Sequence, residues 1–89
     1  GGIAANALGA TRIGRLAFDL AQGVETVLVE DDAIAAARRA LWREARLLVE
    51  PAGAAALAAL TSGAYRPARG ERVAILICGA NPAPDPLED

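Results

Sequence analysis

The chain has 89 residues, a net charge of −2 and no lysine, histidine or methionine, so all nine of its basic residues are arginines. These arginines are interspersed with acids and form no basic stripe that could neutralise a phosphate backbone, which argues against nucleic-acid binding. The single cysteine excludes an internal disulfide, and the longest nearly apolar run, residues 52–60, is far shorter than a membrane span. We therefore expect residues 1–89 to form one domain, or a fragment of one, in the cytoplasm.

The first part of the chain predicts a short helix and then a strand. Residues 1–10 contain three glycines and are expected to be an irregular lead-in. Apolar side chains recur at helical spacing over residues 13–20, behind a candidate cap at Thr11 and before Gly23. Residues 24–29 carry three valines and a leucine. That run is too short for a helix and rich in β-branched residues, so it predicts a strand.

A longer amphipathic helix is predicted after Asp31 and Asp32, which suit the positive end of a helix dipole. Its apolar positions step by three or four residues and are Ile34, Ala37, Leu41, Ala45 and Leu48. Its outer face is expected to carry Arg38, Arg39, Arg43, Glu44 and Arg46. Charge runs of this kind are usually solvated, and we assign these side chains no ligand.

Pro51 suits the first turn of a third helix, and residues 52–60 offer that helix no polar face, which predicts that it is buried. Gly63 is expected to end it. Residues 73–77 are an unbroken apolar run, typical of a parallel strand covered on both faces. The proline-rich residues 81–89 predict a loose tail.

The predicted order of elements is helix, strand, helix, helix, strand. This pattern indicates an α/β fold whose two strands belong to a mainly parallel, helix-covered sheet. Two strands are too few to be stable in water, so further strands are expected from elsewhere in a parent protein or from another copy. The exposed edges also favour a homo-oligomer.

The residues after the last predicted strand are the first candidates for a binding site. Ligands of open α/β sheets lie beyond the carboxyl ends of the strands, where Cys78, Gly79 and Asn81 stand. The Cys78 thiol could meet a ring nitrogen, and Gly79 would let a flat ligand approach the backbone. A lone cysteine at the end of an apolar strand is more often a small core residue, and Asn81 before Pro82 could simply end a turn.

Glu50 is the second candidate, because it precedes a helix whose start is expected to be buried. A carboxylate there is usually a helix-terminus charge, but an unpaired buried carboxylate is costly, which favours a role in lining a site. No cluster with metal-ligand spacing and no phosphate-binding glycine loop accompanies it.

Several segments of the chain follow one another in the same order as matching segments of a known enzyme family. They are residues 3–10, 12–14, 27–31, 34–42, 48–57 and 77–81. In these segments the chain resembles the C-terminal part of the serine/threonine dehydratases, which are fold-type II enzymes that use pyridoxal phosphate. The resemblance implies part of a cofactor-bearing large domain like that of the tryptophan synthase β subunit. It also implies β-elimination of water from L-threonine or L-serine, giving a 2-oxo acid and ammonia.

The resemblance also implies roles for four residues. Cys78 holds the position where the family places a serine or cysteine beside the pyridine nitrogen of the cofactor. Glu50 would line the same cavity, Gly79 would let the ring approach, and Asn81 would be a further cofactor-binding residue. A neutral partner for the ring nitrogen suits the elimination of a hydroxyl group.

The chain also departs from the family pattern. Asn6 and Ala7 stand where many bacterial relatives have aspartate and serine, which leaves the role of that segment open. The family's cofactor-tethering lysine and its phosphate-binding loop belong to an earlier part of the enzyme, so we expect the 89 residues alone to be inactive.

The sequence also allows two other functions. One is a non-catalytic α/β module that assembles with another chain through exposed strand edges. The other is a redox or acyl-transfer role for Cys78, which is disfavoured because no histidine, lysine or second cysteine accompanies it.

Overall fold

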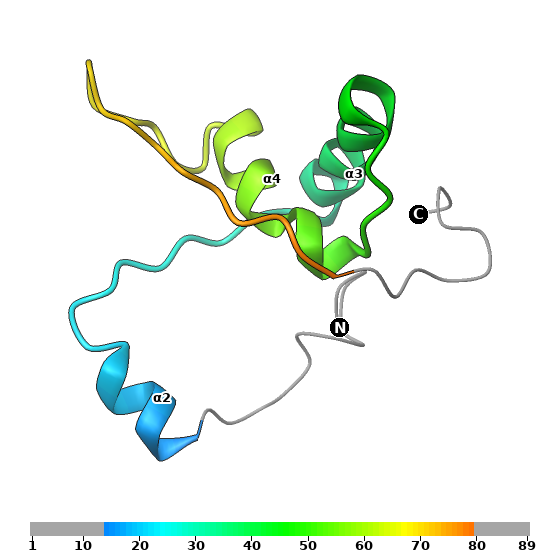
Figure 1. Ribbon diagram of the computed structural model, residues 1–89. Coiled ribbons are helices and arrows are strands. Elements are labelled where there is room, and N and C mark those ends of the chain that lie inside the picture. Colours follow the sequence, from blue (N-terminus) through cyan, green and yellow to red (C-terminus); the bar gives the residue numbers. More distant parts are fainter. Residues whose placement is uncertain (1–13, 80–89) are drawn as a thin grey trace.

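The computed structural model describes residues 14–79, which consist of helices joined by extended segments and turns. The helical elements in this range are α2 (Arg15–Leu20), α3 (Asp31–Ala45), the 3₁₀ helix η1 (Pro51–Ala54) and α4 (Ala55–Thr61). Helices α3, η1 and α4 pack against one another, whereas α2 lies apart from them (Figure 1). The predicted lead-in over residues 1–10 and the predicted tail over residues 81–89 fall outside the described residues.

Helix α3 forms the centre of the packed part. Asp31 and Asp32 occupy its first turn, where their negative charges favour the positive end of the helix dipole. Ile34, Ala37 and Leu41 are buried at spacings of three and four residues, so one apolar stripe faces η1 and α4. The helix predicted from this periodicity is therefore confirmed over Asp31–Ala45.

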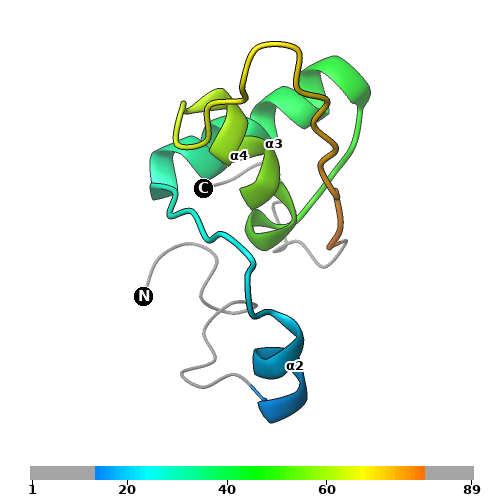
Figure 2. The ribbon, with the colours of Figure 1, turned by 90° about the vertical axis from the view of Figure 1, so that its left-hand side faces the viewer.

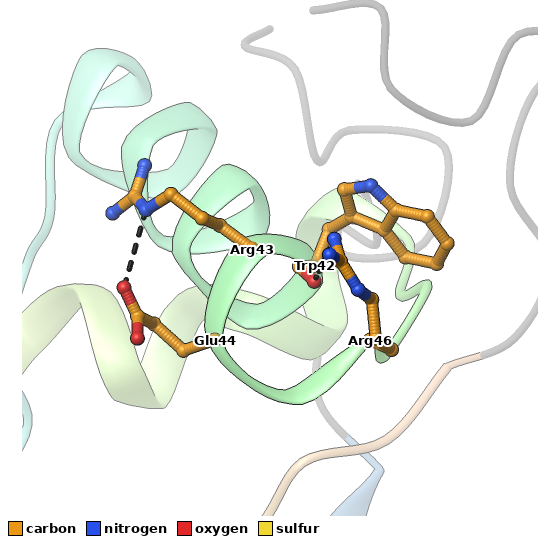
Figure 3. Close-up of polar contacts among 4 residues, drawn as sticks. All are labelled: Trp42, Arg43, Glu44 and Arg46. Atoms are coloured by element: carbon orange, nitrogen blue, oxygen red, sulfur yellow. Dashed lines mark hydrogen bonds and ion pairs between the residues drawn. The ribbon is translucent and has the colours of Figure 1, made fainter.

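The predicted C-terminal end of this helix, at Leu48, is wrong. Arg46 adopts the left-handed conformation with φ of 56°, and its backbone N–H donates to the carbonyl oxygen of Trp42 at 2.9 Å. This single bond from a left-handed residue is a common way for a helix to end, and the N–H of Leu47 also donates to the carbonyl oxygen of Leu41 at 3.2 Å. The Arg46 guanidinium also lies over the Trp42 ring, 5.3 Å from its centroid (Figure 3). The left-handed backbone at Arg46 and its hydrogen bonds end the helix before Leu48. The spacing of apolar residues does not reveal these features.

The third predicted helix forms, but in two parts. Pro51 begins the 3₁₀ helix η1, and the chain continues from Ala55 as α4. Ala54 and Ala58 have no exposed surface, and their small side chains let this helical pair approach α3 closely. Ala56 is exposed, so the predicted burial of every face is wrong.

One hydrophobic core joins these elements. Its buried members are Ile34, Ala37, Leu41, Val49, Ala54 and Ala58, with Val29, Ala33, Leu57 and Ile77 packed against it. Val29 belongs to the first extended segment, residues 24–29 before α3, and Ile77 belongs to the second extended segment, residues 73–79 after α4, so both segments touch the core.

The predicted α/β fold is contradicted, because residues 14–79 contain no strand. Residues 24–29 and 73–77 have no regular secondary structure and form no ladder with each other. A β-branched, apolar composition favours extended backbone, but a strand exists only when a neighbour pairs with its N–H and C=O groups. The composition of these segments indicates a preference for extended backbone. It does not indicate whether another segment pairs with them to form a ladder.

The later segment is also not covered on both faces as predicted. Ile75 and Ile77 are half-buried, whereas Leu76 between them is 78% exposed. This alternation places one face of the segment on the packed helices and the other in solvent. Figures 1 and 2 show the segment running alongside η1 and α4 towards Gly79.

Helix α2 forms near its predicted position but buries none of its residues. Its large apolar side chains are open to solvent: Leu16 is 73%, Phe18 54% and Leu20 75% exposed. Figure 2, turned by 90°, shows the same separation from α3 and α4.

Candidate functional site

The candidate site lies where the start of η1 meets the end of the second extended segment. The backbone N–H of Glu50 donates a hydrogen bond of 2.9 Å to the carbonyl oxygen of Gly79. This bond joins two positions that are far apart in the sequence. We call the meeting point of residues 49–53 and 78–79 the junction.

The side chain of Glu50 lies directly over Gly79. A Cβ atom built on Gly79 would stand 2.6 Å from Cγ and 2.9 Å from Cδ of Glu50, closer than real carbon contacts allow. Gly79 also has a φ of 85°, a region that residues with a side chain rarely adopt. The backbone conformation therefore favours glycine, and any larger residue would also displace the Glu50 side chain.

A second glycine makes the other half of the junction. A Cβ atom on Gly53 would stand 2.7 Å from the carbonyl carbon of Cys78 and closer still to its oxygen. Gly53 is buried in η1, so the backbone of Cys78 lies directly against this helix. Glycine at position 53 thus permits backbone-to-backbone contact at the point where Cys78 stands.

The Cys78 side chain is a free, exposed thiol. The interpretation of Cys78 as a small core residue does not describe its place in this structure. An exposed thiol can meet a ligand from solvent, and as a weak donor and acceptor it can pair with a ring nitrogen.

The structure thus brings together three of the four residues predicted for the site. Glu50, Gly79 and Cys78 meet at the junction, with the Glu50 side chain half-buried. Asn81 lies outside the described residues. The cofactor-binding roles of all four remain predictions.

One residue that contacts the junction was not expected there from the sequence. Arg38 was assigned to the solvated face of the second helix, but it is only 5% exposed, and that assignment is wrong. Its Nε atom donates a hydrogen bond of 3.0 Å to the carbonyl oxygen of Val49. The signal was present in the register: position 38 comes four residues after Ile34 and three before Leu41, on the same buried stripe.

Electrostatics shift the pKa values of one described pair, which lies away from the junction. The Tyr65 hydroxyl donates to Oε2 of Glu71, and the backbone N–H of Ala68 donates to Oε1 at 2.7 Å. These two hydrogen bonds, the one from Tyr65 first, hold the pKa of the Glu71 carboxyl below its ordinary value. The same hydrogen bond to Glu71 is the main reason why the pKa of Tyr65 is raised.

Among the described residues, no three histidine, cysteine, aspartate or glutamate side chains are grouped so that they could hold a metal ion. Nor does any helix within residues 14–79 have the length and apolarity needed to cross a membrane. A cytoplasmic location and a homo-oligomeric state remain predictions.

Comparison with known proteins identifies the family. Residues 2–79 match the family described as pyridoxal-phosphate dependent enzyme. The chain belongs to this family. Pyridoxal phosphate is accordingly the cofactor of the complete enzyme, and the resemblance drawn from the sequence is confirmed.

Curated relatives of this pyridoxal-phosphate family member include dehydratases from three bacteria. The chain is 46% identical over 55 residues to phenylserine dehydratase of Ralstonia pickettii, a match covering 62% of the chain and 17% of that relative. It is 39% identical over 83 residues to the biosynthetic L-threonine dehydratases of Escherichia coli K12 and Salmonella typhimurium LT2. Each of those matches covers 90% of the chain and 16% of the relative. The chain thus spans about a sixth of the length of these relatives, and no solved structure matches it.

Proposed function

We propose that these residues supply one wall of the cofactor site in a pyridoxal-phosphate-dependent lyase that acts on β-hydroxy amino acids. The observation that carries the proposal is the junction, where the Glu50 side chain lies over Gly79 and the backbone of Cys78, whose thiol is exposed, lies against Gly53. Membership of the pyridoxal-phosphate family supplies the chemical context.

The residues present are compatible with such a cofactor. Cys78 is exposed, so a planar ring can reach its sulfur from solvent. The backbone beside it at Gly79 carries no Cβ, which lowers the steric barrier to close approach of a flat group. When bound, pyridoxal phosphate supplies an electron sink for bond breaking at the amino-acid substrate.

Cys78 is proposed to face the pyridine nitrogen of the cofactor. A thiol pairs with that nitrogen as a weak, neutral hydrogen-bonding partner, so the ring withdraws electrons less strongly than it would beside a carboxylate. Such moderate withdrawal suits the loss of a hydroxyl group from the β-carbon of the substrate.

Glu50 is proposed to line the cavity next to Cys78. Its backbone is held by Gly79 and its side chain is half-buried over the same glycine, so the carboxylate has a defined place at the junction. Asn81, two residues after Gly79, remains a proposed further contact to the cofactor.

The proposed substrates are L-threonine and L-serine. Phenylserine and threonine, named in the curated relatives, both carry a hydroxyl on the β-carbon. Elimination releases that hydroxyl as water, and hydrolysis of the remaining product by one water gives a 2-oxo acid and ammonia. The 89 residues contain no lysine to tether the cofactor, so we propose that they act only together with the part of the enzyme that provides it.

The alternative function, a module that assembles with another chain through exposed strand edges, is not supported by the described residues. Residues 14–79 present no strand and therefore no strand edge. The lyase is the function that the described residues support best.

Substitution of Cys78 in the full-length enzyme tests the proposal. Cys78→Ser keeps a small hydrogen-bonding group beside the ring and is expected to retain turnover and the cofactor absorbance spectrum. Cys78→Ala removes the group and is expected to slow elimination by about tenfold or more and to shift the spectrum. If both variants match the unmodified enzyme in turnover and spectrum, Cys78 does not face the ring nitrogen.

A further inference from the structure

The peptide unit that joins Val49 to Glu50 is hydrogen-bonded on both of its sides. Its carbonyl oxygen accepts from Nε of Arg38 at 3.0 Å, and its N–H donates to the carbonyl oxygen of Gly79 at 2.9 Å. One bond comes from the middle of α3 and the other from the end of the second extended segment. The peptide unit thus links the helical core to the residue beside Cys78.

This arrangement fixes the orientation of the peptide plane. Peptide units are planar, and the described residues contain no cis bond, so the C=O of Val49 and the N–H of Glu50 point in opposite directions. A donor on one side and an acceptor on the other therefore prevent the plane from rotating. A cationic donor on the oxygen also polarises the amide and strengthens its N–H as a donor to Gly79.

The N–H of this peptide unit holds the Glu50 backbone beside Gly79, and the Glu50 side chain packs over the same glycine with no room for a Cβ between them. Rotation of the plane would turn this N–H away from Gly79. It would thereby break the bond to Gly79 and release the backbone beside the exposed Cys78 thiol.

We propose that Arg38 is a positioning residue for the site, acting through the Val49–Glu50 peptide to hold Glu50, Gly79 and Cys78 in register. This inference rests on the proposed function, because it assigns Arg38 to the cofactor wall formed by those residues. Arg38 itself has no direct role in the chemistry.

The burial of Arg38 separates it from another arginine on α3. Its side chain is only 5% exposed, whereas Arg43 and Glu44 form an ion pair with exposed fractions of 68% and 74% (Figure 3). Exposed pairs of that kind contribute little, while a buried cation that is bonded to a backbone carbonyl constrains the chain locally. Arg43 is therefore the matched control on the same helix.

Two substitutions of equal reach isolate the hydrogen bond. Glutamine places an amide nitrogen at the position of the arginine Nε, so Arg38→Gln keeps a donor to Val49. Methionine places a methyl group there, so Arg38→Met fills similar space without a donor. Both remove the charge and the guanidinium group, so the two variants differ in whether a polar donor is present at the position of the arginine Nε.

The test compares these variants in the full-length protein without cofactor and then with it. In Arg38→Met, the Glu50 amide is expected to exchange with solvent deuterium at least about fivefold faster than in Arg38→Gln. Amides within α3 and α4 are expected to exchange alike in both variants. The Cys78 thiol is expected to react with a thiol reagent at a different rate only in Arg38→Met, and Arg43→Met is expected to leave both readouts unchanged.

With pyridoxal phosphate added, the cofactor absorbance of Arg38→Met is expected to differ from that of Arg38→Gln. Equal effects of the two Arg38 variants at Glu50 and Cys78, including unfolding of both, would overturn the proposal. The readouts taken without cofactor do not depend on the proposed function. Suppose that Arg38→Met alone changes the exchange of the Glu50 amide and the reactivity of Cys78, while the absorbance spectrum shows no response to pyridoxal phosphate. That outcome would support the positioning role of Arg38 and refute the lyase site.

Discussion

Residues 14–29 and residues 30–61 have comparable proportions of apolar side chains, but these side chains are almost all exposed in the first region and mostly buried or half-buried in the second. In the first region, Leu28 is 95% exposed and α2 buries none of its residues. In the second, Ala37, Ala54 and Ala58 are almost or entirely inaccessible, although alanine offers far less apolar surface than leucine. Within residues 14–61, burial therefore depends on which elements pack together and not on the hydrophobicity of the residues alone.

The comparison extends to the glycines. Gly53 in the packed region touches the backbone of Cys78, whereas an added Cβ at Gly14, at the start of α2, would meet nothing within 4 Å. The packed region depends on the absence of side chains at specific points. The outlying region places no comparable demand on its glycine.

The largest expected change in the free energy of unfolding comes from Gly53→Ala, and Gly14→Ala is its control in the outlying region. Gly53→Ala forces the η1 backbone away from Cys78, because neither backbone can move as a side chain would, and it should cost about 3 kcal/mol or more. Gly14→Ala should cost less than about 1 kcal/mol, since it affects only the helix start. Urea unfolding of the full-length protein measures both. Similar costs for the two variants would erase the distinction between the regions.

A smaller effect is expected at Arg46, at the exposed end of the packed helix α3. Arg46→Gly removes the cost of a left-handed φ, whereas Arg46→Ala keeps that cost, so the glycine variant should be more stable by about 1 kcal/mol. Both variants lose the contact with the Trp42 ring, which therefore cancels in the comparison. Thermal unfolding of the two proteins gives the difference. Equal stability would mean that packing, and not local backbone chemistry, sets this helix end.

The smallest effect is expected in the exposed loop that contains Tyr65 and Glu71, which local hydrogen bonds hold together. The pKa of Glu71 is lowered in the folded chain, so the stabilisation is present above its unfolded pKa and is lost as the pH falls through the folded pKa. Tyr65→Phe removes the largest cause and should raise the pKa of Glu71 towards its ordinary value. Carboxyl-carbon NMR of Glu71 across an acid titration measures this.

Ser62→Ala provides the control for that titration. It removes the hydrogen bond of 3.3 Å that the Ser62 hydroxyl accepts from the Ala64 N–H, and it leaves both partners of Glu71 intact. The pKa of Glu71 should therefore stay where it is in the unmodified protein. An equal rise in both variants would show that Tyr65 is not the cause.

Much of the local structure could be predicted from the sequence. The acidic first turn and apolar spacing of α3, and the proline that begins η1, express preferences of short segments and needed no distant partner. The two predicted strands do not form within residues 14–79, because side-chain type favours extended backbone but a ladder requires a second chain segment. The assignment of Arg38 to a solvated face was wrong for a related reason: arginine usually faces water, and the carbonyl of Val49 that accepts its hydrogen bond comes from a segment after the helix.

The candidate site shows the same division. The amino-acid sequence alone determines the membership of the pyridoxal-phosphate family and the absence of lysine. It also gives the identities of Glu50, Cys78 and Gly79. Only the tertiary structure decided that Glu50 lies over Gly79, that Gly53 lies against Cys78 and that Arg38 holds the peptide between Val49 and Glu50. The physical reason is that composition and spacing act along the chain, whereas close contact between backbones depends on which distant segments fold against each other.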